Sequence, residues 1–124
     1  MYNVIFYEDK RGRSEIEEYL KKLHKKKDKE SKIKLSKITA YLNMLKKQGC
    51  NIGEPYIKHL EDEIWELRPL RDRILFACFD NNEFILLSIF MKKTQKTPKS
   101  EIQKAKRNLK NYIDRRREYE KQTF

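Results

Sequence analysis

The chain has 124 residues and a formal net charge of +11 at pH 7, with 30 Lys and Arg against 19 Asp and Glu. This length fits one domain, residues 1–124, and the apolar runs are shorter than the roughly 20 residues that a membrane-spanning helix needs. Cys50 and Cys78 lie far apart and outside zinc-ligand spacings, which argues against a disulfide scaffold and a zinc module. The N-terminus lacks the basic leader of a secretory signal, so we expect a reduced, cytoplasmic protein. The excess positive charge favours a polyanionic partner, unless it serves solubility alone.

The N-terminal half begins with a strand pattern, which two helical patterns follow. Residues 2–8 are rich in β-branched and aromatic side chains and predict a strand. Ser14 and Glu17 form a capping box, and apolar residues at helical spacing predict a helix that ends in the charge run 25–30. A second helix is expected from near Ser31 to Gly49, because glycine suits a helix C-terminus. Together the two helices would form an antiparallel hairpin.

From residue 56 onward the side-chain pattern changes from a helical period of 3.6 to a period of 2, and the segment 83–91 is very apolar and is expected to be central in the sheet. This pattern predicts strands over 56–60, 64–70, 73–79 and 83–91, with a tight hairpin turn at 80–82. Cys78 lies within an apolar run and is expected to be a core residue. Thr97 is expected to cap a last helix that has Pro98 in its first position. Apolar residues at helical spacing predict the core face of that helix: Ile102, Ala105, Leu109, Tyr112 and Ile113.

This order of elements indicates an α+β fold. Helices would pack on one face of an antiparallel sheet of four to five strands, with a helical hairpin before the sheet and a helix after it. The other face would be partly open and would carry the functional site. Alternation within the last strand places Ile85, Leu87 and Ile89 under the helices, and Ser88 and Phe90 on the open face.

Basic side chains gather on the predicted strands and directly after them. Arg68 and Arg73 belong to neighbouring strands, and Lys92 and Lys93 follow the last strand. Guanidinium and ammonium groups on a rigid sheet bind phosphate, and an aromatic ring can stack on an unpaired base. Two alternatives remain: the charges protect a sheet edge from aggregation, or an arginine pairs with Glu66 and only holds the sheet together.

Several motifs follow one another in the second half of the chain. They are Ile57-Lys-His-Leu60, Ile64-Trp-Glu-Leu-Arg68, Arg73, Leu86-Leu-Ser-Ile-Phe-Met-Lys-Lys93 and Gln95-Lys-Thr-Pro98, with Glu101 and Ala105 after them. This series resembles the RelE/ParE superfamily of toxins from type II toxin–antitoxin modules, most closely its phage-type HigB branch. The resemblance runs over nearly the whole chain and implies a RelE-like fold.

The resemblance implies a bacterial toxin that enters the ribosome and cuts mRNA, and that a HigA-type helix-turn-helix antitoxin neutralises. Such enzymes use neither a metal ion nor another cofactor: the ribose 2′-hydroxyl attacks the neighbouring phosphate, and basic side chains stabilise the developing charge. Carried over by position, the expected catalytic residues are Arg68, Arg73, Lys92 and Lys93. The expected RNA-binding residues are Lys58, Phe90 and Lys96.

Two questions stay open at this point. RelE has a catalytic tyrosine near its C-terminus, whereas Tyr112 lies on the apolar face of the last predicted helix. The general base is therefore either a lysine or ribosomal RNA. ParE relatives, in addition, share the fold but poison DNA gyrase by binding it. The basic residues of the sheet favour the ribonuclease over this second class.

Overall fold

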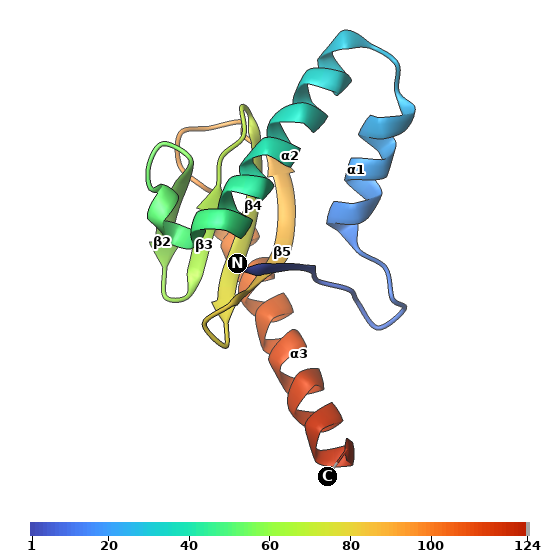
Figure 1. Cartoon of the computed structure of the whole chain (residues 1–124), viewed down its shortest axis with the longest axis vertical. Coiled ribbons are helices and arrows are strands. Elements are labelled where there is room, and N and C mark those ends of the chain that lie inside the picture. Colours follow the sequence, from blue (N-terminus) through green and yellow to red (C-terminus); the bar gives the residue numbers. More distant parts are fainter. Residues whose placement is uncertain (124) are drawn as a thin grey trace.

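The computed structural model describes residues 1–123, and its N-terminal part is a strand followed by a helical hairpin (Figure 1). Strand β1 spans Asn3–Phe6, helix α1 spans Glu15–Lys25 and helix α2 spans Lys29–Gln48. The Ser14 hydroxyl accepts the Glu17 N–H at 3.2 Å and so caps α1. The Asp28 carboxylate accepts the Ser31 N–H at 3.0 Å and caps α2 in the same way. The predicted hairpin is confirmed, with α2 starting slightly earlier than expected.

The rest of the chain contains four strands and a long C-terminal helix. A 3-10 helix (Gly49–Ile52) leads into β2 (Ile57–Glu61), β3 (Ile64–Leu67), β4 (Asp72–Phe79), β5 (Glu83–Met91) and α3 (Lys99–Thr123). Strand β3 ends earlier than predicted because a turn containing Pro69 follows it, and proline has no N–H to donate to a ladder. Within residues 1–123, none of the helices is both long and apolar enough to cross a membrane.

The five strands form one mixed sheet in the order β1-β5-β4-β3-β2. Strands β2 to β5 pair antiparallel with their neighbours, whereas β1 pairs in parallel with β5. The predicted α+β class is confirmed, and the antiparallel part of the sheet is the meander that the short turns indicate. The parallel strand reflects the long path through α1, α2 and three strands that separates β1 from β5.

Helices cover both faces of the sheet. Helices α1 and α2 pack on one face, where Ile38 and Leu45 join the core. Helix α3 packs on the opposite face through Ile102, Ala105 and Leu109. The prediction of a partly open face was therefore wrong. The apolar stripe of α3 was recognised, but periodicity does not say to which face a helix returns after the last strand.

Strand β5 is interrupted by a β-bulge in its middle. Leu75 of β4 is the Cα partner of Ser88, but the next residue, Phe76, is the partner of Leu86. Leu87 is thus an extra residue on β5, with no partner of its own on β4.

Beyond the bulge, each side chain of β5 faces the side of the sheet opposite to the one that simple alternation predicts. Ile85 and Leu87 pack toward α3, whereas Ile89, beyond the bulge, packs toward α1 and α2. The predicted continuous aliphatic face of these three residues was wrong, because a shift of one residue turns every later side chain to the other face. As a result Phe90 faces the α3 side, next to its Cα partner Arg73.

Two local predictions were also wrong. Cys78 is exposed, because it lies next to last in β4, close to the hairpin turn. Thr97 does not cap α3: its hydroxyl donates to Glu66 Oε2 at 2.5 Å. The Pro98 carbonyl accepts the N–H groups of Glu101 and Ile102, and Pro98 precedes the helix rather than opening it.

A buried carboxylate ties the helical hairpin to the start of β4. Asp72 is 1% exposed, and its Oδ1 accepts the Tyr19 hydroxyl at 2.8 Å and lies 3.8 Å from Lys34 Nζ. Burial raises the pKa of Tyr19 above its ordinary value, so the phenol keeps the proton that it donates. These contacts fix the residue directly before Arg73.

Candidate catalytic pocket

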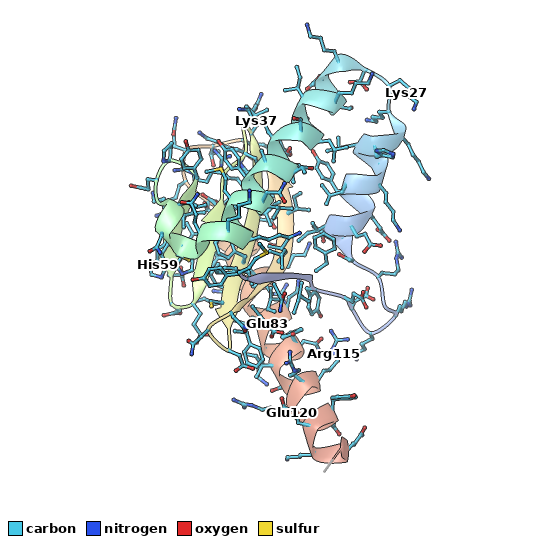
Figure 2. All side chains as sticks on the ribbon, viewed as in Figure 1. Lys27, Lys37, His59, Glu83, Arg115 and Glu120 are labelled. Atoms are coloured by element: carbon cyan, nitrogen blue, oxygen red, sulfur yellow. The ribbon has the colours of Figure 1, made fainter. Side chains whose placement is uncertain are left out.

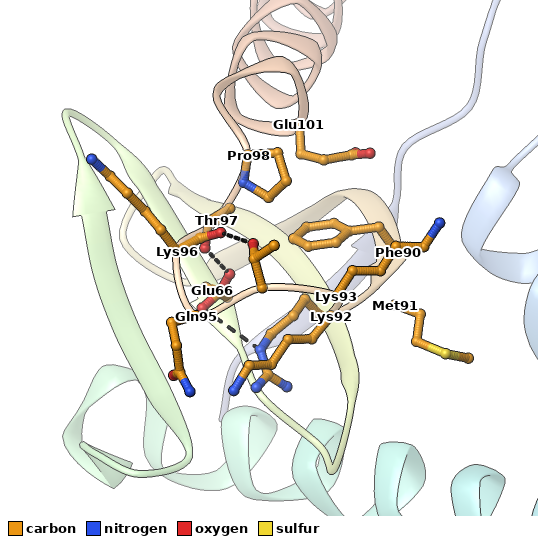
Figure 3. Close-up of a pocket in the computed structure, with 12 residues that line it drawn as sticks. Glu66, Phe90, Met91, Lys92, Lys93, Gln95, Lys96, Thr97, Pro98 and Glu101 are labelled. Atoms are coloured by element: carbon orange, nitrogen blue, oxygen red, sulfur yellow. Dashed lines mark hydrogen bonds and ion pairs between the residues drawn. The ribbon is translucent and has the colours of Figure 1, made fainter.

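A pocket of about 300 Å³ lies where β4 begins and β5 ends (Figure 3). Glu66 of β3 and Arg73 of β4 form its inner part, and Phe90 contributes the aromatic side chain. The loop 92–98 and Glu101, in the first turn of α3, complete the lining. Sheet, loop and helix thus meet at one hollow on the α3 side of the sheet.

The pairing of the strands explains why these residues meet. Arg73 and Phe90 are Cα partners across β4 and β5, and Glu66 is the Cα partner of Leu75, two positions from Arg73. Because alternate residues of a strand share a face, Glu66 and Arg73 project to the same side. The bulge at Leu87 brings Phe90 to that side too.

Arg73 is a buried cation with a fixed orientation. Its side chain is 8% exposed, and its Nη1 donates to the carbonyls of Leu70 and Asp72, both at 2.8 Å. Its Nε lies 3.9 Å from Glu66 Oε1, and Nη2 takes part in none of these contacts. Burial lowers the pKa of Arg73 from its usual value, and the Glu66 carboxylate opposes that shift. An arginine remains protonated in a folded protein, so the inner wall of the pocket holds a guanidinium beside the Glu66 carboxylate.

Glu66 connects three elements around this cation. It is 2% exposed, and its Oε1 lies 3.4 Å from Arg68 Nε as well as near Arg73. Its other oxygen accepts the Thr97 hydroxyl, which attaches the loop 92–98 to β3. The pairing of both arginines with Glu66, foreseen as the alternative, is therefore present. It holds Arg73 in place and leaves Arg73 in the pocket lining.

The lysines after β5 provide the outer charges. The Lys92 N–H donates to the Arg71 carbonyl at 2.7 Å, so pairing between β4 and β5 continues past Met91 and fixes the Lys92 backbone. Lys92 is half-buried and Lys93 is exposed, and both line the pocket. Lys96 also lines it, although its side chain extends away from Glu66 (Figure 3).

The structure brings together most of the predicted site. Five of the residues proposed from the sequence line this pocket: Arg73, Phe90, Lys92, Lys93 and Lys96. Arg68 contacts the site only through Glu66, and Lys58 is exposed on β2 as the Cα partner of Glu66, outside the lining. Within residues 1–123, no three His, Cys, Asp or Glu side chains gather as metal ligands would.

Sequence reasoning missed Thr97 and Glu101 as parts of the site. Thr97 stands directly before a proline, a position typical of a helix N-cap, so the sequence indicates a cap. Its contact with a distant strand leaves no pattern in the sequence. Glu101 places a buried Oε1 without a hydrogen-bond partner at the pocket wall. Glu101 belongs to the motif series that carries the family resemblance, but an acidic residue is common in a first helical turn, so its place in the series did not indicate a role in the site.

The pocket is suited to a phosphodiester group beside an unpaired base. A guanidinium held by carbonyls and two nearby ammonium groups provide donors for phosphate oxygens. The Phe90 ring provides a surface on which a base can stack.

Two comparisons with known proteins bear on this site. Residues 18–110 match the family model described as "Phage derived protein Gp49-like (DUF891)", and this match includes the pocket from Glu66 to Glu101. No curated protein matches the sequence.

Proposed function

Because the chain belongs to the Gp49-like family of phage-derived, RelE/toxin-like proteins, we propose that it is the toxin of a type II toxin–antitoxin module that cuts mRNA on the ribosome. The observation that carries this proposal is the basic pocket in which Arg73, Lys92 and Lys93 meet beside Phe90. The proposal includes the finer assignment to the phage-type HigB branch, with a HigA-type helix-turn-helix antitoxin as partner and the cytoplasm as the place of action.

In the proposed reaction the pocket holds one phosphodiester of the message. The ribose 2′-oxygen attacks phosphorus, and the bond from phosphorus to the 5′-oxygen of the next nucleotide breaks. One fragment ends in a 2′,3′-cyclic phosphate, and the other starts with a 5′-hydroxyl. The 2′-hydroxyl proton passes to a base supplied by a lysine or by ribosomal RNA, and the leaving oxygen takes up a proton.

Each residue has a distinct task in this proposal. Arg73 Nη2 and the ammonium groups of Lys92 and Lys93 stabilise the charge that develops on the phosphate oxygens. Phe90 stacks on the flanking base. Arg68 is a positioning residue, since its contact with the site runs through Glu66.

Lys58 and Lys96 are proposed to attract the RNA backbone at a greater distance. Both side chains are exposed, and water and salt screen their charges accordingly.

Induction of the protein in a bacterial host tests the target. We expect growth arrest together with new RNA 5′ ends inside the translated parts of abundant messages. Inhibited translation without new 5′ ends would contradict the proposal. Gyrase-linked DNA breaks without RNA cleavage would instead support the ParE-like alternative, a gyrase inhibitor without nuclease activity.

A further inference from the structure

An apolar groove of about 450 Å³ adjoins the catalytic pocket, between α2 and the start of β4. Ile33, Leu70 and Met91 line it, and they are 46%, 47% and 44% exposed. Met91 also lines the catalytic pocket, so the two depressions share a wall. Large apolar side chains that gather in one exposed groove mark an interaction site more often than isolated ones do.

The backbone at Leu70 holds its side chain in the groove at a conformational cost. Leu70 has a φ of 56°, in the left-handed region that a bulky residue rarely adopts. The turn is fixed by the Arg73 guanidinium on the Leu70 carbonyl and by the Asp72 N–H on the Pro69 carbonyl, at 2.8 and 3.1 Å. Glycine or asparagine would adopt this φ with less strain, so the apolar side chain itself is the feature that needs a functional reason.

The rim of the groove is mainly positive. Lys29, Lys34 and Arg71 line it, against a single acidic residue, Glu30. Because Lys34 is already paired with the buried Asp72, the positive charges that a partner meets are those of Lys29 and Arg71. Along α2, Lys29 and Lys37 stand four residues before and after Ile33, on the same helix face; Lys37 is labelled in Figure 2. A partner that places apolar side chains in the groove and carboxylates on its rim is therefore complementary to it.

The apolar residues of the groove also indicate a protein partner rather than RNA. Ile33, Leu70 and Met91 are aliphatic or thioether side chains, and none offers a ring on which a base would stack. An amphipathic peptide segment binds such a groove by placing its apolar side chains inside and its charged side chains against the rim.

We infer that the groove binds an acidic, amphipathic peptide segment of a protein inhibitor. Through Met91, a segment seated there reaches the mouth of the catalytic pocket and blocks RNA. The identification of this segment as part of the antitoxin rests on the proposed function. The groove and the kind of peptide that it binds follow from its lining residues and do not depend on that function.

Two synthetic peptides of equal negative charge test the inference on the full-length chain. One carries Leu at i, i+3, i+4 and i+7 among Glu residues, and the other carries Ser at those positions. With Ile, Leu and Met methyl groups labelled, we expect the Leu peptide to shift the NMR signals of Ile33, Leu70 and Met91. In fluorescence anisotropy the Ser peptide should bind about tenfold more weakly or worse.

Variants of the groove separate apolar contact from charge. Ile33→Gln and Leu70→Asn should each lower the affinity for the Leu peptide by about tenfold. Both should keep the unfolding transition, since Gln suits a helix and Asn tolerates the φ of Leu70. Lys29→Glu should also weaken binding, whereas Lys47→Glu, an exposed residue at the other end of α2, should have little effect.

Equal binding of both peptides, or unchanged binding by folded Ile33→Gln and Leu70→Asn proteins, would overturn the inference. So would groove methyl shifts caused by a short single-stranded RNA and not by the Leu peptide. Groove-dependent binding of the Leu peptide by a chain that does not cut RNA would uphold the groove and overturn the proposed function.

Discussion

Replacement of Arg73 by alanine should lower ribosome-dependent cleavage by roughly 10²- to 10³-fold, the usual effect of removing one preorganised donor. The Arg73 side chain is 8% exposed, and two backbone carbonyls fix its guanidinium. The group therefore needs no reorganisation when charge develops on the phosphate. Arg73→Lys should also be poor, because one ammonium group cannot bond the carbonyls and a phosphate in the geometry of the planar fork.

The control for Arg73 is an arginine of the same charge outside the pocket. Arg107 is exposed on α3, and Arg107→Ala should retain most of the cleavage rate. Because Arg73→Ala also removes the donor to the Leu70 and Asp72 carbonyls, its folded fraction is determined from an unfolding curve before rates are compared. Full cleavage by folded Arg73→Ala would remove this residue from the mechanism and leave Lys92 and Lys93 as the main phosphate ligands.

The second large effect concerns stability. Glu66→Ala should lower the free energy of unfolding by about 3 kcal/mol, because it leaves the charges of Arg68 and Arg73 without their shared carboxylate. It also removes the acceptor of the Thr97 hydroxyl. Urea unfolding followed by circular dichroism measures the change.

Two variants calibrate this result. Thr97→Val removes only the hydrogen bond to Glu66 and should cost about 1–3 kcal/mol. Asp114→Ala removes an exposed i,i+4 pair with Lys110 and should cost less than about 1 kcal/mol. If Glu66→Ala were as mild as Asp114→Ala, the buried carboxylate would not be what holds the two arginines.

The sequence predicts the elements of this fold well and their faces less well. The apolar run of 83–91, which follows the turn at 80–82, matches the bounds of β5, because a short apolar run bounded by turn residues is typical of a buried strand. The bulge at Leu87 depends on the pairing with β4, and no feature of the pattern signals an inserted residue. That one residue decides whether Ile89 and Phe90 face the hairpin or α3.

The candidate site shows the same difference between what local pattern predicts and what tertiary packing creates. The tight turn at 80–82 was expected to pair the two strands beside it, and this pairing is confirmed. The turn alone would place Arg73 opposite Ile89, however, and only the bulge at Leu87 makes Phe90 its Cα partner. The contact between Thr97 and Glu66 joins residues 31 positions apart on a loop and a strand, and only tertiary packing creates it. Glu101 reaches the pocket through the direction in which α3 leaves the sheet.

The most direct test of the proposed function uses purified protein with a labelled message on programmed ribosomes. We expect cleavage only of the ribosome-bound message, with a 2′,3′-cyclic phosphate on the upstream fragment and a 5′-hydroxyl on the downstream one. An intact message, equal cleavage of free RNA, or downstream fragments that start with a 5′-phosphate would contradict an attack by the ribose 2′-hydroxyl within this pocket.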